Sequence, residues 1–271
     1  MATIYQKLKN RYSINTLSIT EHCSLRCSFC NIWQKEEKSD FEENQDLTFW
    51  QRNQEITKFK RLFSKLESFW KKKAVTSDLV DLITREELFD HFKLTKKINL
   101  IGGEPGNYES LKEILSYLKE KSIEIHFWTS GIWNFKEFEP NIAYLDQIYF
   151  YLPSILADEY LEVTGFDYLG LALENLDNLL AAGKKVIINC PIQLETIQNS
   201  PLLTDFTEAK KLPLIIGYNK SQGFTKESIE YIERYRRVKG IRVYKTKKPL
   251  KHNCACYLKL APRGFEPRFK D

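Results

Sequence analysis

The sequence predicts an α/β fold, an open partial (β/α)6 barrel with parallel strands. Short apolar runs alternate with amphipathic helical segments along most of the chain, which is the pattern of βα units. About six such units can be distinguished, fewer than the eight of a closed barrel. The motifs that carry chemistry also follow the ends of these runs, where parallel sheets place their functional sites.

The elements follow from these runs in chain order. Candidate strands are residues 16–20, 98–101, 123–128, 147–152, 185–190 and 214–218, with 241–244 as a last edge strand. Candidate helices are residues 85–92, 110–121, 168–182 and 226–237.

A long connection, residues 35–77, precedes the second strand. Apolar residues recur there at helical spacing, so a helical insertion is predicted rather than an irregular loop. These residues are Ile56, Phe59, Leu62, Phe63, Leu66, Phe69 and Trp70. Its many lysines form either a solvated face or a surface for an acidic peptide, RNA or electron donor.

Composition limits the class of protein. The chain has 271 residues, of which 42% are hydrophobic and 28% charged, as in folded globular proteins. A net charge of +5 is too small to require nucleic acid. No apolar run is long enough to cross a membrane and the N-terminus lacks a secretory signal, so a cytoplasmic protein without a membrane partner is expected. We expect a barrel over residues 1–250 and an extension over 251–271.

Three of the six cysteines, Cys23, Cys27 and Cys30, form a C-x3-C-x2-C pattern after the first strand. A closed zinc or iron–sulfur site takes four protein ligands, so this trio is one ligand short. An open coordination position suits a metal that binds a substrate or cofactor directly. A zinc knuckle with a distant fourth ligand is the alternative.

A second motif, Gly102-Gly103-Glu104-Pro105, ends the second strand. Paired glycines let the backbone approach a ligand closely. Together with the cysteine pattern, in which Phe29 supplies the aromatic residue, this motif resembles the radical S-adenosylmethionine (radical SAM) superfamily. The resemblance implies a radical SAM barrel.

The resemblance also implies cofactors and roles. Three thiolates would hold a [4Fe–4S] cluster whose fourth iron binds S-adenosylmethionine (SAM), which one electron cleaves to a 5′-deoxyadenosyl radical. A flavodoxin or ferredoxin would supply the electron. Phe29 would flank the adenine, and Gly102, Gly103 and Glu104 would bind the methionyl amino group. The implied ribose contacts are the strand-end residues Thr129, Ser130 and Asn189. No catalytic side chain is identified.

The order of elements over residues 151–189 resembles the branch containing the molybdopterin-pathway cyclase and the peptide-maturing enzymes, which implies a peptide or small-metabolite substrate. The chain departs from that branch at residues 151–154, Tyr-Leu-Pro-Ser, where a Ser-x-Asp-Gly stretch is common. One alternative is a glycyl-radical-enzyme activase. Another, from a different class, is a zinc-stabilised RNA-binding module.

Cys190, Cys254 and Cys256 are the other three cysteines. Together they would ligate a second iron–sulfur cluster, with Cys190 at the mouth of the barrel. The alternatives for Cys190 alone are packing in the core, or a role as a redox thiol or hydrogen-atom donor. The last residues, 261–271, contain Gly-Phe-Glu-Pro, which is what the T-arm of a transfer-RNA gene would encode. We therefore expect this tail to have no function.

Overall fold

The computed structural model describes residues 12–20, 22–28, 30, 93–194, 196–219, 223–238, 240–246 and 259–262. Its centre is an eight-stranded sheet with the order β7-β6-β5-β4-β3-β2-β1-β8. The strands are β1 (Tyr12–Ser18), β2 (Lys93–Ile101), β3 (Glu124–Thr129), β4 (Gln147–Tyr151), β5 (Val186–Pro191), β6 (Leu214–Asn219), β7 (Ile241–Thr246) and β8 (Lys259–Pro262). Strands β1 to β7 pair in parallel, and β8 pairs antiparallel with β1.

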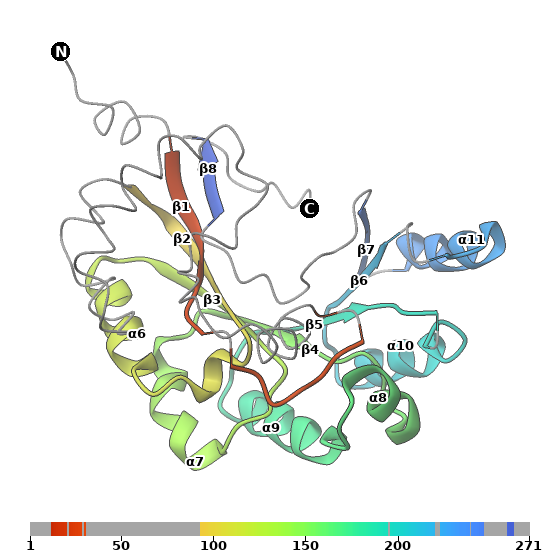
Figure 1. Ribbon diagram of the computed structural model, residues 1–271, viewed down its shortest axis with the longest axis horizontal. Coiled ribbons are helices and arrows are strands. Elements are labelled where there is room, and N and C mark those ends of the chain that lie inside the picture. Colours follow the sequence, from red (N-terminus) through yellow and green to blue (C-terminus); the bar gives the residue numbers. More distant parts are fainter. Residues whose placement is uncertain are drawn as a thin grey trace, which may run out of the picture.

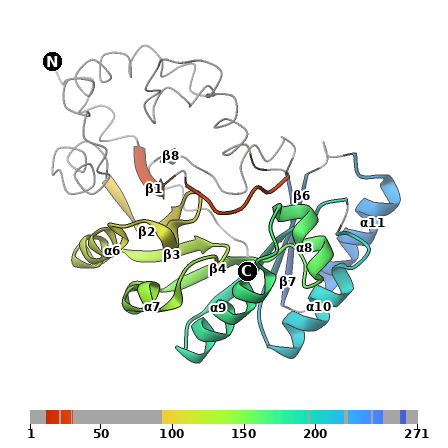
Figure 2. The ribbon, with the colours of Figure 1, turned by 60° about the horizontal axis from the view of Figure 1, so that its bottom comes forward.

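Helices cover one side of this curved sheet (Figures 1 and 2). The α-helices are α6 (Leu111–Glu120), α7 (Phe135–Phe138), α8 (Ala157–Thr164), α9 (Leu169–Ala181), α10 (Ser200–Ala209) and α11 (Lys226–Arg234). Short 3-10 helices are η1 (Pro105–Asn107), η2 (Glu139–Tyr144) and η4 (Tyr235–Arg237). Each parallel crossover from β2 to β7 therefore contains helical structure, as βα units require.

Residue alternation along the strands gives the sheet two different faces. On the helix-covered outer face lie residues such as Leu100, Phe127 and Ile188, which pack in the main apolar core and are fully buried. Their neighbours in sequence point to the inner face, because successive side chains in a strand alternate. That inner face is more polar and aromatic, and it carries Asn99 and Trp128, which are partly exposed.

The predicted fold class is confirmed, since the sheet is open and its parallel strands alternate with helices. Each strand and helix predicted within the described residues overlaps an observed element, although β2 begins five residues earlier than predicted and helices α7, α8 and α10 were not predicted. The predicted insertion (35–77), the predicted helix 85–92 and the last residues, 263–271, lie outside the described residues. No helix in the described part of the chain is long and apolar enough to span a membrane.

Strand β8 was not predicted. It lies in the expected extension, and its residues Ala261 and Pro262 pair with Ser13 and Tyr12 of β1. These two residues belong to the tail for which no function is expected, yet they form part of the sheet. They therefore contribute to the structure, whatever the origin of the tail.

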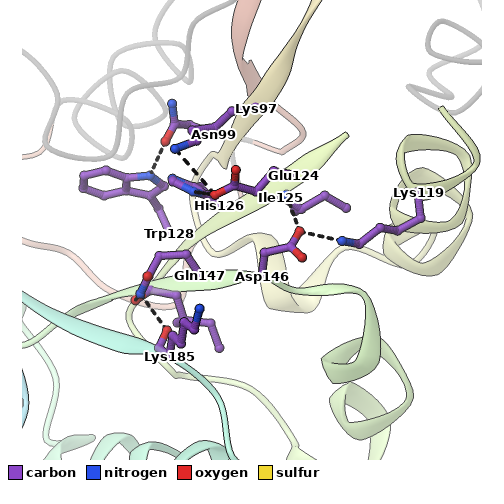
Figure 3. A network of polar contacts seen from close by, with 11 residues as sticks. Lys97, Asn99, Lys119, Glu124, Ile125, His126, Trp128, Asp146, Gln147 and Lys185 are labelled. Atoms are coloured by element: carbon purple, nitrogen blue, oxygen red, sulfur yellow. Dashed lines mark hydrogen bonds and ion pairs between the residues drawn. The ribbon is translucent and has the colours of Figure 1, made fainter. Parts of the chain in front are cut away.

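A polar network joins β3 to its surroundings on both faces (Figure 3). On the outer side, the Asp146 carboxylate accepts hydrogen bonds from the Ile125 amide at 2.7 Å and from Lys119 Nζ at 2.5 Å. Burial raises the pKa of Asp146, but these two hydrogen bonds outweigh it, so the pKa lies below its ordinary value. The ionised carboxylate thus ties α6 to the start of β3.

Replacing Asp146 by Asn should lower the free energy of unfolding at pH 7 by about 1 kcal/mol, a small effect because both charged groups are partly solvated. A carboxylate with a depressed folded-state pKa stabilises the fold above its unfolded-state pKa and loses this contribution as the pH falls through the folded-state value. The difference between the two proteins should therefore shrink as the pH falls through the folded-state pKa of Asp146. Urea unfolding at several pH values measures it, and a pH-independent difference would contradict this account.

Candidate functional site

The loop that carries the three predicted ligands is held by main-chain hydrogen bonds at both ends. At its start, the Gly103 amide donates to the Thr20 carbonyl at 2.8 Å and the Glu104 amide donates to the His22 carbonyl at 2.7 Å. Further along, the loop crosses to helix α8 (Figure 1). There the amides of Arg26 and Ser28 donate to the carbonyls of Thr164 and Val163 at 2.7 and 2.9 Å. The two predicted motifs, cysteine pattern and Gly-Gly-Glu, are therefore brought into direct contact.

The three thiols are partly or fully shielded from solvent. Cys27 and Cys30 are buried and Cys23 is partly buried. Burial raises the pKa of the Cys23 thiol to about 12, and the nearby Glu104 carboxylate adds to the rise. Burial also raises the pKa of Cys27, as do the neighbouring Cys23 and Cys30, whereas a hydrogen bond with the Tyr151 hydroxyl opposes the rise.

This donor set fits a thiolate-ligated iron cluster. No three His, Cys, Asp or Glu side chains among the described residues are already grouped to hold a metal ion. The three thiols nevertheless influence one another electrostatically. Buried neighbouring thiols retain their protons until a metal cation compensates the charge of the thiolates. Soft sulfur ligands with one position left open suit iron–sulfur chemistry.

Glu104 is fully buried and its carboxylate accepts four hydrogen bonds. Its Oε1 accepts from Thr129 Oγ1 at 2.6 Å and from the Gly106 amide at 3.1 Å. Its Oε2 accepts from the amide and the hydroxyl of Ser130 at 2.8 and 2.5 Å. Burial raises the pKa of Glu104, and the hydrogen bonds from Ser130 and Thr129 counteract this rise. The side chain thereby ties the end of β2 to the end of β3.

Gly102 allows the close contact between β2 and the cysteine loop. A Cβ atom at this position would lie 2.5 Å from the Thr20 carbonyl oxygen, a backbone atom that cannot move away cheaply. The same glycine precedes the Gly103 amide that bonds to that carbonyl. The first glycine of the motif is therefore required by packing, independently of any ligand.

Replacing Gly102 by Ala should lower the free energy of unfolding by about 2 kcal/mol and reduce the iron bound per chain, because the overlap separates the cysteine loop from β2. The matched control is Gly170→Ala in helix α9, where an added Cβ meets nothing within 4 Å. That change should leave iron binding unaltered and stabilise the helix by up to about 1 kcal/mol. Equal iron content in both variants would contradict the role given to Gly102.

The predicted ribose contacts occupy different environments. The Thr129 hydroxyl donates to Glu104 and accepts from the Gly131 amide and from Trp133 Nε1, both at 2.9 Å. The Thr129 hydroxyl therefore already has hydrogen-bond partners within the protein. Asn189 is buried and pairs in register with Tyr151, so both residues belong to the inner face. Phe29 lies outside the described residues.

Cys190 does not lie where the second-cluster hypothesis needs it. It is at the end of β5, as expected, but it pairs in register with Ile216 on the outer, helix-covered face rather than facing the mouth of the barrel. Its Sγ donates to the Pro153 carbonyl at 3.5 Å, and burial raises its pKa to about 12. These properties are typical of a cysteine that packs in the core. Cys254 and Cys256 lie outside the described residues, and nothing here supports a second cluster.

Two tyrosines near the cysteine loop were missed by the sequence analysis. Tyr151 ends β4 on the inner face, and its hydroxyl lowers the pKa of the Cys27 thiol. Tyr160, on α8, is fully buried, and its hydroxyl has no hydrogen-bond partner in the described part of the protein. Strand alternation could have indicated Tyr151, but a helical tyrosine next to acidic residues gives no such signal.

The inner face next to this site presents aromatic and polar side chains. Trp128 and Tyr149 stack with ring centroids 4.3 Å apart, and Trp128 Nε1 donates to Asn99 Oδ1 at 3.1 Å. Figure 3 shows Asn99, His126 and Trp128 on the same side of β3. His126 approaches Glu124 at 2.7 Å, and burial lowers its pKa. Such a surface offers both stacking and hydrogen bonding to a molecule that lies against it.

Comparison with known structures supports the fold. The chain aligns with Streptococcus suis SuiB at a TM-score of 0.55 and 16% identity, over 87% of this chain and 50% of SuiB. For SuiB bound to S-adenosylmethionine, the TM-score is 0.54 and the identity 15%, over 87% of this chain and 48% of SuiB. For SuiB bound to precursor peptide SuiA, the TM-score is 0.53 and the identity 14%, over 86% of this chain and 49% of SuiB. The chain thus spans about half the length of this neighbour, and at this identity the likeness concerns the fold alone.

No curated protein matches the chain in sequence. The family model of the radical SAM superfamily matches residues 17–199, a segment that contains the cysteine loop, the Gly-Gly-Glu motif and strands β2 to β5. That segment covers more than half of the chain, and its motifs meet in space as described above. The chain therefore belongs to the radical SAM superfamily.

Proposed function

We propose that the protein binds a [4Fe–4S] cluster through Cys23, Cys27 and Cys30, cleaves SAM reductively and abstracts hydrogen from a peptide. The observation that carries this proposal is the cysteine loop, whose partly or fully buried thiols are fixed between the Gly-Gly-Glu motif and helix α8. When bound, a reduced cluster supplies the electron that splits SAM into methionine and a 5′-deoxyadenosyl radical. The protein binds and orients the cofactors and the substrate, and it excludes water from the site.

The chain's own residues have separate tasks in this proposal. Gly102, Gly103 and Glu104 form the subsite for the methionyl amino group, and Phe29 flanks the adenine. Thr129 and Ser130 act chiefly through Glu104, because their hydroxyls donate to its carboxylate. Asn189, on the inner face, is then the best placed of the three candidates for the ribose.

A peptide is the substrate class that we favour over a small metabolite. SuiB, which shares the fold, has been crystallised with a precursor peptide. In this chain, the Trp128–Tyr149 stack and Asn99 provide apolar area and hydrogen-bonding groups on the inner face. Both kinds of contact suit a peptide, which offers side chains and main-chain amides together. A flavodoxin or ferredoxin is the expected electron donor.

The test begins with anaerobic purification and analysis of iron, sulfide and zinc. We expect about four irons per chain and formation of 5′-deoxyadenosine when dithionite and SAM are added. Stoichiometric zinc without SAM cleavage would overturn the proposal. Substrate class is then tested with peptide and small-molecule fractions from cells grown in heavy water. Deuterium in 5′-deoxyadenosine with the peptide fraction supports a peptide, and deuterium only with the small-molecule fraction refutes it.

A further inference from the structure

Tyr160 occupies a position that couples helix α8 to the cysteine loop. It lies four residues before Thr164, whose carbonyl accepts the hydrogen bond from the Arg26 amide of that loop. The Thr164 hydroxyl in turn donates to the Tyr160 carbonyl at 2.6 Å. The backbone of α8 around Tyr160 is therefore firmly connected to the segment that carries Cys23, Cys27 and Cys30.

The side chain of Tyr160 is fully buried, with 0% of its surface exposed, yet its hydroxyl has no hydrogen-bond partner among the described residues. Buried polar groups in folded proteins nearly always have partners, because an unsatisfied donor loses its bonds to water without compensation. Phenylalanine would fill the same space without this cost. The hydroxyl therefore needs a partner that the described protein does not supply.

The surroundings of the hydroxyl identify the site to which it belongs. Burial raises the pKa of Tyr160, and the next largest influences are Cys27, Glu104 and Cys23, each of which raises it further. These groups belong to the cysteine loop and the Gly-Gly-Glu motif. A neutral phenol beside thiols that become thiolates when a metal binds is suited to donate a hydrogen bond to an anionic acceptor.

We propose that the Tyr160 hydroxyl donates a hydrogen bond to an anionic acceptor of the bound cofactor pair, either a cluster sulfur or the carboxylate of SAM. This inference rests on the function proposed above and adds a binding residue to the same site. It treats the unpartnered hydroxyl as half of a contact that is completed when the cofactors bind.

The test is Tyr160→Phe, which removes the oxygen and preserves the ring. The cofactor-free variant should unfold at the same temperature as the wild type or a higher one, because only an unsatisfied group is lost. If the acceptor is the SAM carboxylate, the dissociation constant for SAM, measured by equilibrium dialysis on the reconstituted protein, should rise about tenfold. If it is a cluster sulfur, the midpoint potential without SAM should become more negative while the SAM affinity is retained.

The matched control is Tyr218→Phe. Tyr218 is also fully buried, but its hydroxyl donates to Glu233 Oε1 at 2.5 Å. This variant should unfold at a lower temperature and retain both the wild-type SAM affinity and the wild-type midpoint potential.

Three results would overturn the inference. One is a Tyr160→Phe variant with unchanged SAM affinity and unchanged midpoint potential. Another is destabilisation of its cofactor-free form, which would reveal a partner within the protein. The third is a wild-type protein without cluster or SAM binding, which would overturn the proposed function as well.

Discussion

Replacing Cys27 by alanine is expected to abolish both the iron–sulfur cluster and the formation of 5′-deoxyadenosine. A cluster held by three thiolates has no spare protein ligand, and Cys27 is the most buried of the trio, at 4% exposure. Its loss therefore removes a ligand that water cannot readily replace. Iron and sulfide analysis, electron paramagnetic resonance of the reduced protein and chromatography of the SAM products measure the effect.

The control for this experiment is Cys190→Ala. Cys190 is equally inaccessible, but it lies on the opposite face of the sheet and donates to the Pro153 carbonyl. The variant should retain its iron and its SAM cleavage, with the free energy of unfolding lowered by about 1 kcal/mol. Cluster-dependent SAM cleavage by the Cys27→Ala variant would refute the ligand assignment. Loss of about half the iron from the Cys190→Ala variant would support the hypothesis of a second cluster.

Replacing Glu104 by alanine should lower the free energy of unfolding by about 3 kcal/mol or more, because its buried hydrogen-bond donors from Thr129 and Ser130 lose their acceptor together. Glu104→Gln keeps the shape but presents an NH2 group to some of these donors, so a loss of about 2 kcal/mol is expected. Both variants should also weaken SAM binding, because the ends of β2 and β3 are no longer tied together. Urea unfolding and equilibrium dialysis provide the two measurements.

Two further variants distinguish the hydrogen-bond network around Glu104 from the general effect of removing a carboxylate charge. Glu113→Gln changes an exposed carboxylate on α6 and should leave stability and SAM affinity as in the wild type. Ser130→Ala removes one side-chain hydrogen bond of this network, from the Ser130 hydroxyl to Glu104 Oε2, and keeps the hydrogen bond from the Ser130 amide. If Ser130→Ala and Glu104→Gln have additive effects on unfolding, the two side chains do not act as a unit and the network interpretation fails.

Much of the fold and the location of the site could be predicted from the sequence. Runs such as residues 98–101 and 185–190 are rich in apolar residues because one face of each strand is buried, and this burial gives them a recognisable pattern. Parallel strands place their carboxyl ends at one edge, so Cys23 and Glu104 could be expected at the same site from topology alone. The hydrogen bond between the Glu104 amide and the His22 carbonyl agrees with that reasoning.

Other features depend on information that is not local in sequence. A strand end gives no indication of which face a side chain occupies until the register with the next strand is known, and Cys190 therefore seemed to be at the mouth of the barrel. Tyr160 follows two acidic residues, Asp158 and Glu159, and becomes significant only because the packing of α8 buries it completely. Strand β8 is too short to show a pattern, and it exists through its pairing with β1.

The pairing of β8 with β1 has a consequence for the order of folding during synthesis. About 250 residues separate the paired positions Ser13 and Ala261, which corresponds to roughly 10 to 50 s of translation. Until β8 emerges from the ribosome, one edge of β1 lacks its partner, and β1 leads directly into the cysteine loop. The segment that would receive the cluster is therefore adjacent to the last edge of the sheet to be completed, which leaves an interval for cluster delivery before this edge is covered.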